Sequence, residues 1–427
     1  MSQSTPATPD QRAQSRKIHP AWFAAAITFF TLITTAGFRA APSVLIIPLS
    51  ESSLHFTRAN ISLAVSVNIL VYGLTAPFAA ALMGRFGIRR VVMCALMVVG
   101  LGAISTIYIT KPWHLIALWG LVVGFGTGSM ALVFAAMVAN RWFIKRKGLV
   151  VGALTAAGAT GQLIFLPVLS RLANHNWKYV SLVVGTSAIV MVPLIYLFLK
   201  ESPRTAGTTP YGAPDGWVEP EVVKRSAARE AIDTLKQGLG MRDFWFLTGS
   251  FFVCGLSTNG LIGTHLIPAA HDHGMIETTA AGLLAMVGVF DVIGTLFSGW
   301  LTDRIDSRKL LFFYYFLRGL SLFLLPSILF SSIHPSTLIF IIFYGLDWVA
   351  TVPPTIFLAR SVFGPARGMV AYGWIFASHQ IGAAVAAFGA ALLRVKFGDY
   401  AISFYIAGIM CVIASYFVLQ IKKPVAE

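Results

Sequence analysis

The chain has 427 residues, of which 56% are hydrophobic and 11% are charged, and its mean hydropathy is +0.75. Soluble proteins carry about a quarter of charged residues, so the composition excludes an ordinary soluble globular protein. The formal net charge of +15 is spread over short segments between apolar runs, as in membrane proteins rather than nucleic-acid-binding proteins. We therefore expect the lipid bilayer, and no nucleic acid, to be a partner of this chain.

Twelve apolar runs follow one another along the sequence. Residues 1–20 are polar and basic and lack the apolar core of a cleavable signal peptide, so they are predicted to form a cytoplasmic N-terminal tail. Each later run reaches the length of about 20 residues that a membrane-spanning helix needs. We predict an all-α integral membrane protein with twelve transmembrane helices. The predicted spans are 21–49, 60–83, 91–110, 113–138, 149–170, 179–199, 244–269, 279–301, 309–331, 336–359, 369–393 and 400–421.

A polar stretch, residues 200–242, divides the spans into two sets of six. It contains four prolines and six of the 17 acidic residues, so it is predicted to be a cytoplasmic linker in water. Its second part, 221–237, is predicted to form an amphipathic helix along the membrane surface. The linker joins an N-terminal six-helix bundle, 21–199, to a C-terminal six-helix bundle, 243–421. A cytoplasmic tail, 422–427, follows the last span.

The distribution of lysine and arginine predicts the orientation, because these residues accumulate on the cytoplasmic side of membrane proteins. With both termini in the cytoplasm, 24 of the 32 basic residues fall in segments on that side and six on the other. The remaining two, Arg39 and Arg318, lie inside predicted spans. We expect a multi-pass protein of the plasma membrane, such as a bacterial inner membrane, with both termini cytoplasmic.

The loops after the second and the eighth span have related sequences. Residues 80–90 read AALMGRFGIRR, and residues 299–309 read GWLTDRIDSRK. In both loops a small residue and a leucine precede an arginine, and two more basic residues follow at the same spacing. A repeat of this kind predicts two parallel, pseudo-symmetric six-helix halves.

This pattern resembles the G-x-L-x-D-R-x-G-R-R signature of the major facilitator superfamily, and the resemblance extends over essentially the whole chain. The first loop has Gly84 where the signature has aspartate. The resemblance implies the major facilitator fold and a charge-paired latch between helices on the cytoplasmic side, although these residues could serve only as a positive-inside anchor. The latch residues that it implies are Arg85, Gly87, Arg89, Asp303, Arg304 and Arg308.

A second segment is similar to one branch of that superfamily. Residues 142–152 read WFIKRKGLVVG, as in the monocarboxylate porters and the oxalate/formate exchangers, and Asp291 matches a functional aspartate of the porters. The arginine that the porters have one helical turn later is replaced by Thr295. The resemblance implies secondary active transport by alternating access, of a small organic anion such as a monocarboxylate or dicarboxylate, by proton symport or by exchange.

Ionisable residues inside spans are costly in lipid and by default mark a substrate or ion pathway. Four stand out in this chain: Arg39, Asp291, Arg318 and Asp347. From a rise of about 1.5 Å per residue, the first three lie roughly 14–18 Å from a membrane surface, which is near the midplane. The two arginines are candidate ligands for a carboxylate, because its geometry fits a guanidinium group.

Two interpretations of the carboxylates remain open. In the first, Asp291 exchanges between Arg318 and the substrate, or carries a coupled proton. In the second, Asp291 and Arg318 form a permanent structural pair, since a paired charge costs less in the membrane than a lone one. Asp347 lies just before Pro353 and Pro354, whose missing hydrogen bonds would bend a span. It is therefore a candidate coupling or salt-bridge residue in a gating helix.

Weaker candidates are polar residues at mid-depth. Asn68 and Tyr72 lie one helical turn apart in the second predicted span and could line a cavity. His379, in the eleventh span, could bind substrate or titrate during turnover. Residues 258–260, in the seventh span, read Thr-Asn-Gly and could unwind locally. For each of these, ordinary packing is the alternative.

Enzyme chemistry has no visible support. The histidines at positions 271 and 273 have the spacing of metal ligands, but no further ligand lies nearby in the sequence. No nucleophile–base pair or phosphate loop is evident among the spans, so we expect no enzyme activity, cofactor or metal. The leading hypothesis is a secondary transporter, active as a monomer, for a small anionic solute, with protons as a candidate second partner. The alternatives are an exporter of amphiphilic or drug-like compounds, a carrier of neutral solutes and a sensor without transport activity.

Overall fold

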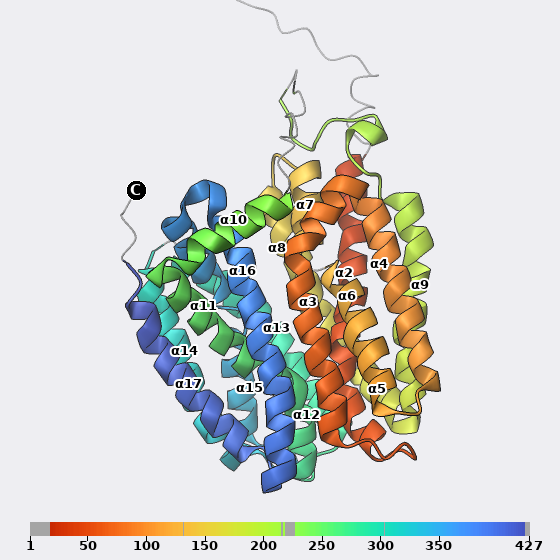
Figure 1. The fold of residues 1–427 in the computed structure, drawn as a ribbon, viewed down its shortest axis with the longest axis vertical. Coiled ribbons are helices and arrows are strands. Elements are labelled where there is room, and N and C mark those ends of the chain that lie inside the picture. Colours follow the sequence, from red (N-terminus) through yellow and green to blue (C-terminus); the bar gives the residue numbers. More distant parts are fainter. Residues whose placement is uncertain (1–17, 131, 215–216, 218–226, 303, 423–427) are drawn as a thin grey trace, which may run out of the picture.

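A computed structural model describes residues 18–130, 132–214, 217, 227–302 and 304–422. In these ranges the chain is almost entirely helical, apart from turns and a single isolated β-bridge. Figure 1 shows two groups of helices side by side, the N-terminal half in red to yellow and the C-terminal half in green to blue. The predicted all-α class is confirmed.

The N-terminal half runs from the first described helix to the start of the polar linker. Its helices are α2 (Pro20–Ser50), α3 (Arg58–Phe86), α4 (Ile88–Ser105), η1 (Thr106–Tyr108), α5 (Pro112–Leu115), η2 (Ile116–Val123), α6 (Gly124–Gly128), α7 (Leu132–Trp142), α8 (Lys147–His175) and α9 (Trp177–Phe198).

The linker contributes two helices, and the C-terminal half follows them. The linker helices are η3 (Arg204–Ala206) and α10 (Ala227–Leu239). The helices of the C-terminal half are α11 (Arg242–Gly255), η4 (Leu256–Ile262), α12 (Gly263–Asp272), α13 (Glu277–Thr302), α14 (Ser307–Ile328), α15 (Pro335–Asp347), α16 (Val352–Phe397) and α17 (Ala401–Leu419).

Ten helical segments within the described residues are long and apolar enough to cross a membrane. They correspond to ten of the twelve predicted spans. The second predicted span coincides with α3, and the fourth with the run from α5 to α7, in which η2 is a π-helical segment. The two halves therefore have the predicted arrangement, and the chain is a multi-pass membrane protein.

Two spans of the C-terminal half are irregular near their middle. The seventh span changes to the π-helical segment η4 at residues 256–262, which include the stretch 258–260. Between α15 and α16, residues 348–351 form a turn. Irregular backbone at membrane depth is tolerated only where it is buried in protein or lines a cavity. These two segments are therefore where a functional site is expected.

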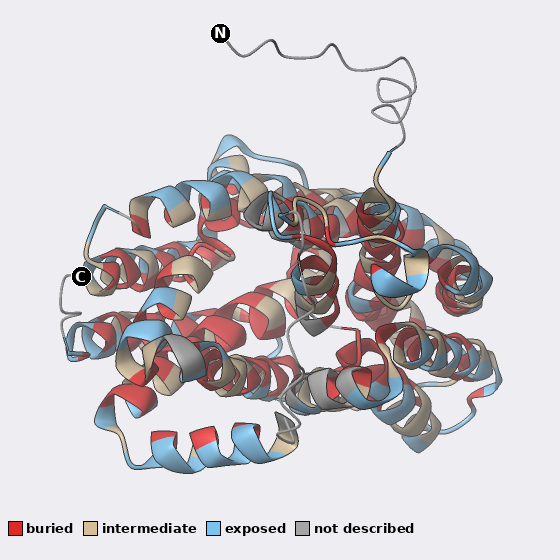
Figure 2. Ribbon diagram, turned by 90° about the horizontal axis from the view of Figure 1, so that it is seen from above, coloured by how far each residue is buried: buried red, intermediate tan, exposed pale blue. Residues whose placement is uncertain are grey.

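The bundle has two distinct ends (Figure 1). We call the end that carries α10 and the turn at 143–146 the linker side, and the opposite end, with the turns at 51–57 and 273–276, the far side. Seen from above in Figure 2, buried residues lie within the bundle and exposed residues lie around its periphery.

The amphipathic linker helix is present as α10 and packs on the linker side. Ala231 and Thr234 on its inner face are buried, and their neighbours on the outer face are exposed. The indole Nε1 of Trp374, in α16, donates a hydrogen bond to the Ala231 carbonyl at 2.8 Å. Residues 218–226, which begin the predicted helix, lie outside the described residues.

The two halves make direct contact through α3 and α16. Ser66 Oγ donates to the Ala384 carbonyl at 2.7 Å. About two helical turns closer to the middle of α3, a Cβ atom added to Gly73 would collide with the side chain of Gln380. Because only glycine leaves room there, α3 and α16 approach closely at this point.

In the N-terminal half, the loop that resembles the family signature is held by Glu201, just after α9. The Glu201 carboxylate accepts hydrogen bonds from the backbone N–H groups of Ile88 at 2.7 Å and Arg89 at 3.1 Å. It also pairs with Arg141 at 2.7 Å. The carboxylate therefore satisfies the unpaired N–H groups and the positive dipole at the start of α4.

The second loop is held in a related way in the C-terminal half. Arg308 pairs with Asp306 at 2.7 Å and donates to the Ile421 carbonyl at 3.0 Å, just after α17. Each loop is thus fixed to the end of the last helix of its own half. This matches the internal repeat that the sequence predicts.

The predicted cytoplasmic latch is not formed between the halves in the part of the chain that is described. The Arg85 guanidinium lies over the Phe86 ring at 5.3 Å, and that of Arg304 lies over the Trp300 ring at 4.2 Å. Within the described ranges neither arginine forms an ion pair with the other half. Asp303 lies outside the described residues, so the latch stays a prediction.

Gly87 should be sensitive to substitution for two reasons. Its φ of +92° and ψ of 148° belong to a region that glycine alone adopts easily. A Cβ atom there would also lie 2.8 Å from Glu201 Oε2. Gly87→Ala is expected to lower the free energy of unfolding by about 2–4 kcal/mol, from backbone strain and the displaced cap. Thermal unfolding of the purified protein measures this.

Gly364 supplies the matched control. Its φ of +78° and ψ of 167° are similar, but an added Cβ would meet no atom within 4 Å. Gly364→Ala should therefore show the strain alone and a smaller loss of thermal stability than Gly87→Ala. Equal losses would show that Glu201 contributes nothing measurable to holding the loop.

Candidate functional site

A cavity with both polar and apolar lining residues lies between the two halves at mid-depth; its empty space, with the solvent that it is open to, is about 700 Å³. The N-terminal half lines it with α2, α3 and α8, and the C-terminal half with η4, α12, α13, the 348–351 turn and α16. Both irregular segments thus reach this cavity. Its lining residues are Arg39, Pro42, Ser43, Val65, Asn68, Ile69, Tyr72, Leu166, Asn259, Gly263, Thr264, Leu284, Trp348 and Gln380.

Arg39 is the charged residue of this lining. Its side chain is exposed although it lies well inside α2. The guanidinium group lies over the ring of Tyr72 in α3, 5.3 Å from the ring centroid, which is a cation–π contact. Within the described residues, Arg39 forms no ion pair. The cavity therefore presents a cation that an anion could approach.

Asn68 and Tyr72 both line the cavity, as their one-turn spacing predicts. Asn68 Nδ2 donates to the Trp119 carbonyl in η2 at 2.7 Å, which fixes the orientation of its amide. Tyr72 is 6% exposed and packs on Phe376. These contacts hold the two side chains in place beside Arg39.

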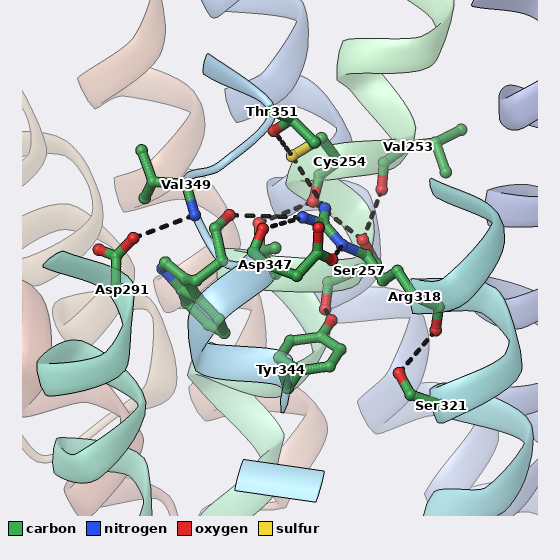
Figure 3. A network of polar contacts seen from close by, with 12 residues as sticks. Val253, Cys254, Ser257, Asp291, Arg318, Ser321, Tyr344, Asp347, Val349 and Thr351 are labelled. Carbon is green, nitrogen blue, oxygen red and sulfur yellow. Dashed lines mark hydrogen bonds and ion pairs between the residues drawn. The ribbon is translucent and has the colours of Figure 1, made fainter. Parts of the chain in front are cut away.

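Arg318 is not on the cavity surface; its side chain is fully buried behind the 348–351 turn. Its Nε donates to Asp347 Oδ2 at 2.5 Å and its Nη2 to the Asp347 carbonyl at 2.6 Å. Its Nη1 donates to Cys254 Sγ at 3.0 Å. Figure 3 shows this network around the turn. The ion-pair partner of Arg318 is therefore Asp347. A permanent pair of Arg318 with Asp291, one of the two interpretations of the sequence, is not formed.

Asp291 lies on the other side of the same turn (Figure 3). Its Oδ1 accepts hydrogen bonds from the Val349 backbone N–H at 3.1 Å and from Thr295 Oγ1 at 3.0 Å. In the described ranges it has no lysine or arginine partner in an ion pair. The residue at 295, where the porters have arginine, thus supplies a neutral hydroxyl donor.

His379 is packed rather than presented to the cavity. It is 7% exposed, and its ring stacks on Phe376 with a centroid distance of 5.8 Å. The neighbouring Gln380 lines the cavity instead, and its Nε2 lies 3.3 Å from His379 Nδ1. The sequence did not single out Gln380 and Trp348, because each stands beside an ionisable residue, His379 or Asp347, whose burial cost in a span is the stronger signal.

The described part of the chain is expected to hold no metal-ligand cluster like the one that the spacing of His271 and His273 suggests. No group of three or more histidine, cysteine, aspartate or glutamate side chains could hold a metal ion there. What the arrangement offers is a mid-membrane cavity shared by two helical halves, with one accessible cation. That combination is typical of secondary transporters.

Comparison with known proteins also indicates a transporter. A family model for the Major Facilitator Superfamily matches residues 27–386 and, in a second match, 255–427. The chain belongs to this superfamily.

Among curated relatives, an uncharacterized MFS-type transporter of Bacillus subtilis, YcxA, is 29% identical over 347 residues, 78% of each chain. Monocarboxylate transporter 13 of Rattus norvegicus is 27% identical and covers 82% of this chain and 77% of its own length.

Solved structures share the fold. A bacterial homologue of the human lysosomal transporter Spinster, in an inward-facing conformation, has a TM-score of 0.74 at 13% identity, over 95% of this chain and 97% of that one. The inward-open xylose transporter XylE of E. coli has a TM-score of 0.71 at 15% identity, with the same coverage. The major facilitator fold is confirmed.

The buried Arg318–Asp347 pair should be essential for stability. Asp347→Asn leaves a buried guanidinium charge without a counter-ion, which costs about 3–5 kcal/mol. Thermal unfolding of the purified variant should show a large loss of stability. The double variant Arg318→Met/Asp347→Leu, which removes both charges, should recover much of that stability. Asp306→Asn is the control, because its pair with Arg308 is partly exposed and costs about 0–1 kcal/mol to lose. A small effect of Asp347→Asn would contradict the pairing.

Proposed function

We propose that this protein carries a small organic monoanion, such as a monocarboxylate, across the membrane together with a proton. The observation that carries the proposal is Arg39, a cation exposed in the central cavity without an ion-pair partner in the described part of the chain. A guanidinium group binds a carboxylate through two parallel hydrogen bonds. The relatives named monocarboxylate transporters support the same substrate class.

The charge of the site favours a monocarboxylate over a dicarboxylate. Arg39 is the one charged residue among the described residues that line the cavity. Arg318, the other arginine inside a span, is neutralised by Asp347 and buried. A second carboxylate on the substrate would therefore lack a counter-ion and would be costly at this depth. Apolar lining residues such as Leu166 and Leu284 suit the hydrocarbon part of a monocarboxylate.

We propose Asp291 as the residue that takes up the coupled proton. It is a carboxylate without an arginine or lysine partner in the described ranges, and it contacts the turn that supplies Trp348 to the cavity. A protonated Asp291 would hold the Val349 N–H less strongly than the carboxylate does. Protonation would thereby act on the turn between α15 and α16, next to the substrate.

We propose that the linker side faces the cytoplasm, because 24 of the 32 basic residues fall in segments on that side. In a bacterium the protein would then lie in the inner membrane with both termini inside. We further propose that it acts as a monomer, since one chain already supplies the whole lining of the cavity. We also propose that it has no enzymatic activity, since its relatives are named as transporters.

Arg39→Gln is expected to reduce uptake of labelled carboxylates, including lactate, pyruvate, formate and oxalate, into proteoliposomes. Loss of a charge-assisted hydrogen bond costs about 1.5–3 kcal/mol, which corresponds to a roughly 10- to 150-fold higher KM. Arg39→Lys retains the charge without the planar fork and should be intermediate. Arg171→Gln, at an exposed position of α8 away from the cavity, is the control and should transport as the parent does.

The same assay separates the second candidate function, export of amphiphilic or drug-like compounds, which the aromatic residues Tyr72 and Trp348 in the cavity favour. If no acid is carried by the parent protein, or if Arg39→Gln carries it equally well, the carboxylate proposal fails. Amphiphilic dyes would then be tested for export.

Asp291→Asn should uncouple transport from protons. Asparagine keeps an oxygen that can accept the Val349 N–H but cannot bind and release a proton at neutral pH. Uptake driven by an inward proton gradient should therefore be lost. Exchange of labelled for unlabelled substrate, with no gradient, should continue. Stimulation of the variant by the gradient to the level of the parent would exclude Asp291 as the proton carrier.

A further inference from the structure

Asp272, at the far side, lies between two arginines that belong to different halves. Arg58 of α3 places Nη1 2.9 Å and 3.0 Å from the two carboxylate oxygens. Arg394 of α16 donates through Nε at 3.0 Å and through Nη2 at 3.3 Å. The side chains of Arg58 and Asp272 are 15% and 13% exposed. The carboxylate is therefore shared by one arginine of each half and is largely shielded from water.

Helix electrostatics does not explain why Arg58 and Asp272 are where they are. Arg58 is the first residue of α3, where the helix dipole is positive, and Asp272 is the last residue of α12, where it is negative. Each charge lies at the unfavourable end of its own helix. Their close approach offsets both penalties, so this placement is favourable only while α3 and α12 are together.

Within the described ranges, Arg58–Asp272 is the ion pair that joins the two halves. The other ion pairs there lie within one half: Arg141–Glu201, His271–Glu277, Arg308–Asp306, Arg318–Asp347 and Arg394–Asp272. The pair lies at the far-side end of α3, beyond the Ser66–Ala384 hydrogen bond that also joins the halves. The ion pair is thus on the far side of the central cavity, whereas Ser66 lies next to Val65, which lines the cavity.

We infer that the Arg58–Asp272 pair is a latch that holds the far side closed, and that Arg394 keeps Asp272 paired when the latch opens. Arg394 and Asp272 both belong to the C-terminal half, so their contact survives when the halves rotate as rigid bodies. Of the three residues in this cluster, opening then leaves only Arg58 without its partner, and water can solvate Arg58 at the start of α3. The inference relies on alternating access and is independent of which solute is carried.

The two arginines therefore have opposite roles, so their loss should change the frequency of far-side opening in opposite directions. Without Arg58 the closed state loses its bridge and the far side opens more often. Without Arg394, opening would leave the Asp272 carboxylate with no partner in the cluster, so the far side should open less often. A cluster that merely stabilises the fold would respond to both losses in the same direction.

The experiment measures access to the cavity from the far side by thiol labelling, which needs no substrate. The background is Cys94→Ala, because Cys94 is exposed and the other two cysteines are buried. The probe is Asn259→Cys in the cavity, and the reference is Ser53→Cys in an exposed far-side turn. A membrane-impermeant thiol reagent is added to intact cells, or to inverted vesicles if the reference reacts only there.

Arg58→Gln should raise the rate of probe labelling relative to the reference by about fivefold, the population shift expected for loss of one partly buried ion pair. Arg58→Lys should retain most of the parent rate, and Arg394→Gln should leave the rate unchanged or lower it. If Arg58→Gln fails to insert, as the reference rate would show, Asp272→Asn takes its place with the same expectation. An unchanged rate without the bridge, or equal increases for Arg58→Gln and Arg394→Gln, would overturn the latch.

Discussion

Backbone groups that leave a helix inside a membrane must find partners within the protein, and in this chain the break between α15 and α16 imposes that requirement. Arg318 takes the carbonyl of Asp347 together with its carboxylate, and Asp291 accepts the N–H of Val349. The break is therefore stabilised from two neighbouring helices, α14 and α13. Trp348 lies within this break and lines the cavity. The shape of the cavity therefore depends on Arg318 and Asp291, although neither side chain lines it.

This arrangement divides the charges inside the membrane into two kinds. Arg318 and Asp347 neutralise each other and hold the backbone, whereas Arg39 and Asp291 have no ion-pair partner in the described ranges. One of these is a cation at the surface of the cavity, and the other is an acid next to the turn that borders it. The proposed coupling of an anion to a proton uses one residue of each kind.

The sequence predicts the fold well because its signals are strong and local. Apolar length, basic loops and the repeated loop after spans two and eight are properties of short segments. Arg39, Asn68 and Tyr72 were predicted to line a cavity and do so, since a charged or polar residue at mid-depth must face something other than lipid.

What the sequence does not predict is pairing across helices. Arg318 has two carboxylates at similar depth as candidate partners, and only the packing of α14 against α15 selects Asp347. Glu201, which caps α4, lies 113 residues from Ile88, and nothing in its local sequence indicates this contact. Asp272 lies between two histidines, and its local sequence does not indicate its two arginines, which come from distant segments.

The close approach of α3 and α16 at Gly73 has a mechanical consequence. Gly73 lies near the middle of α3, about 22 Å along the helix from Arg58 and about 20 Å from Phe86, at a rise of 1.5 Å per residue. A rotation of the halves about this contact moves the two ends of α3 in opposite directions through nearly equal distances. If the halves pivot at this contact, the openings on the two sides of the membrane are similar in width.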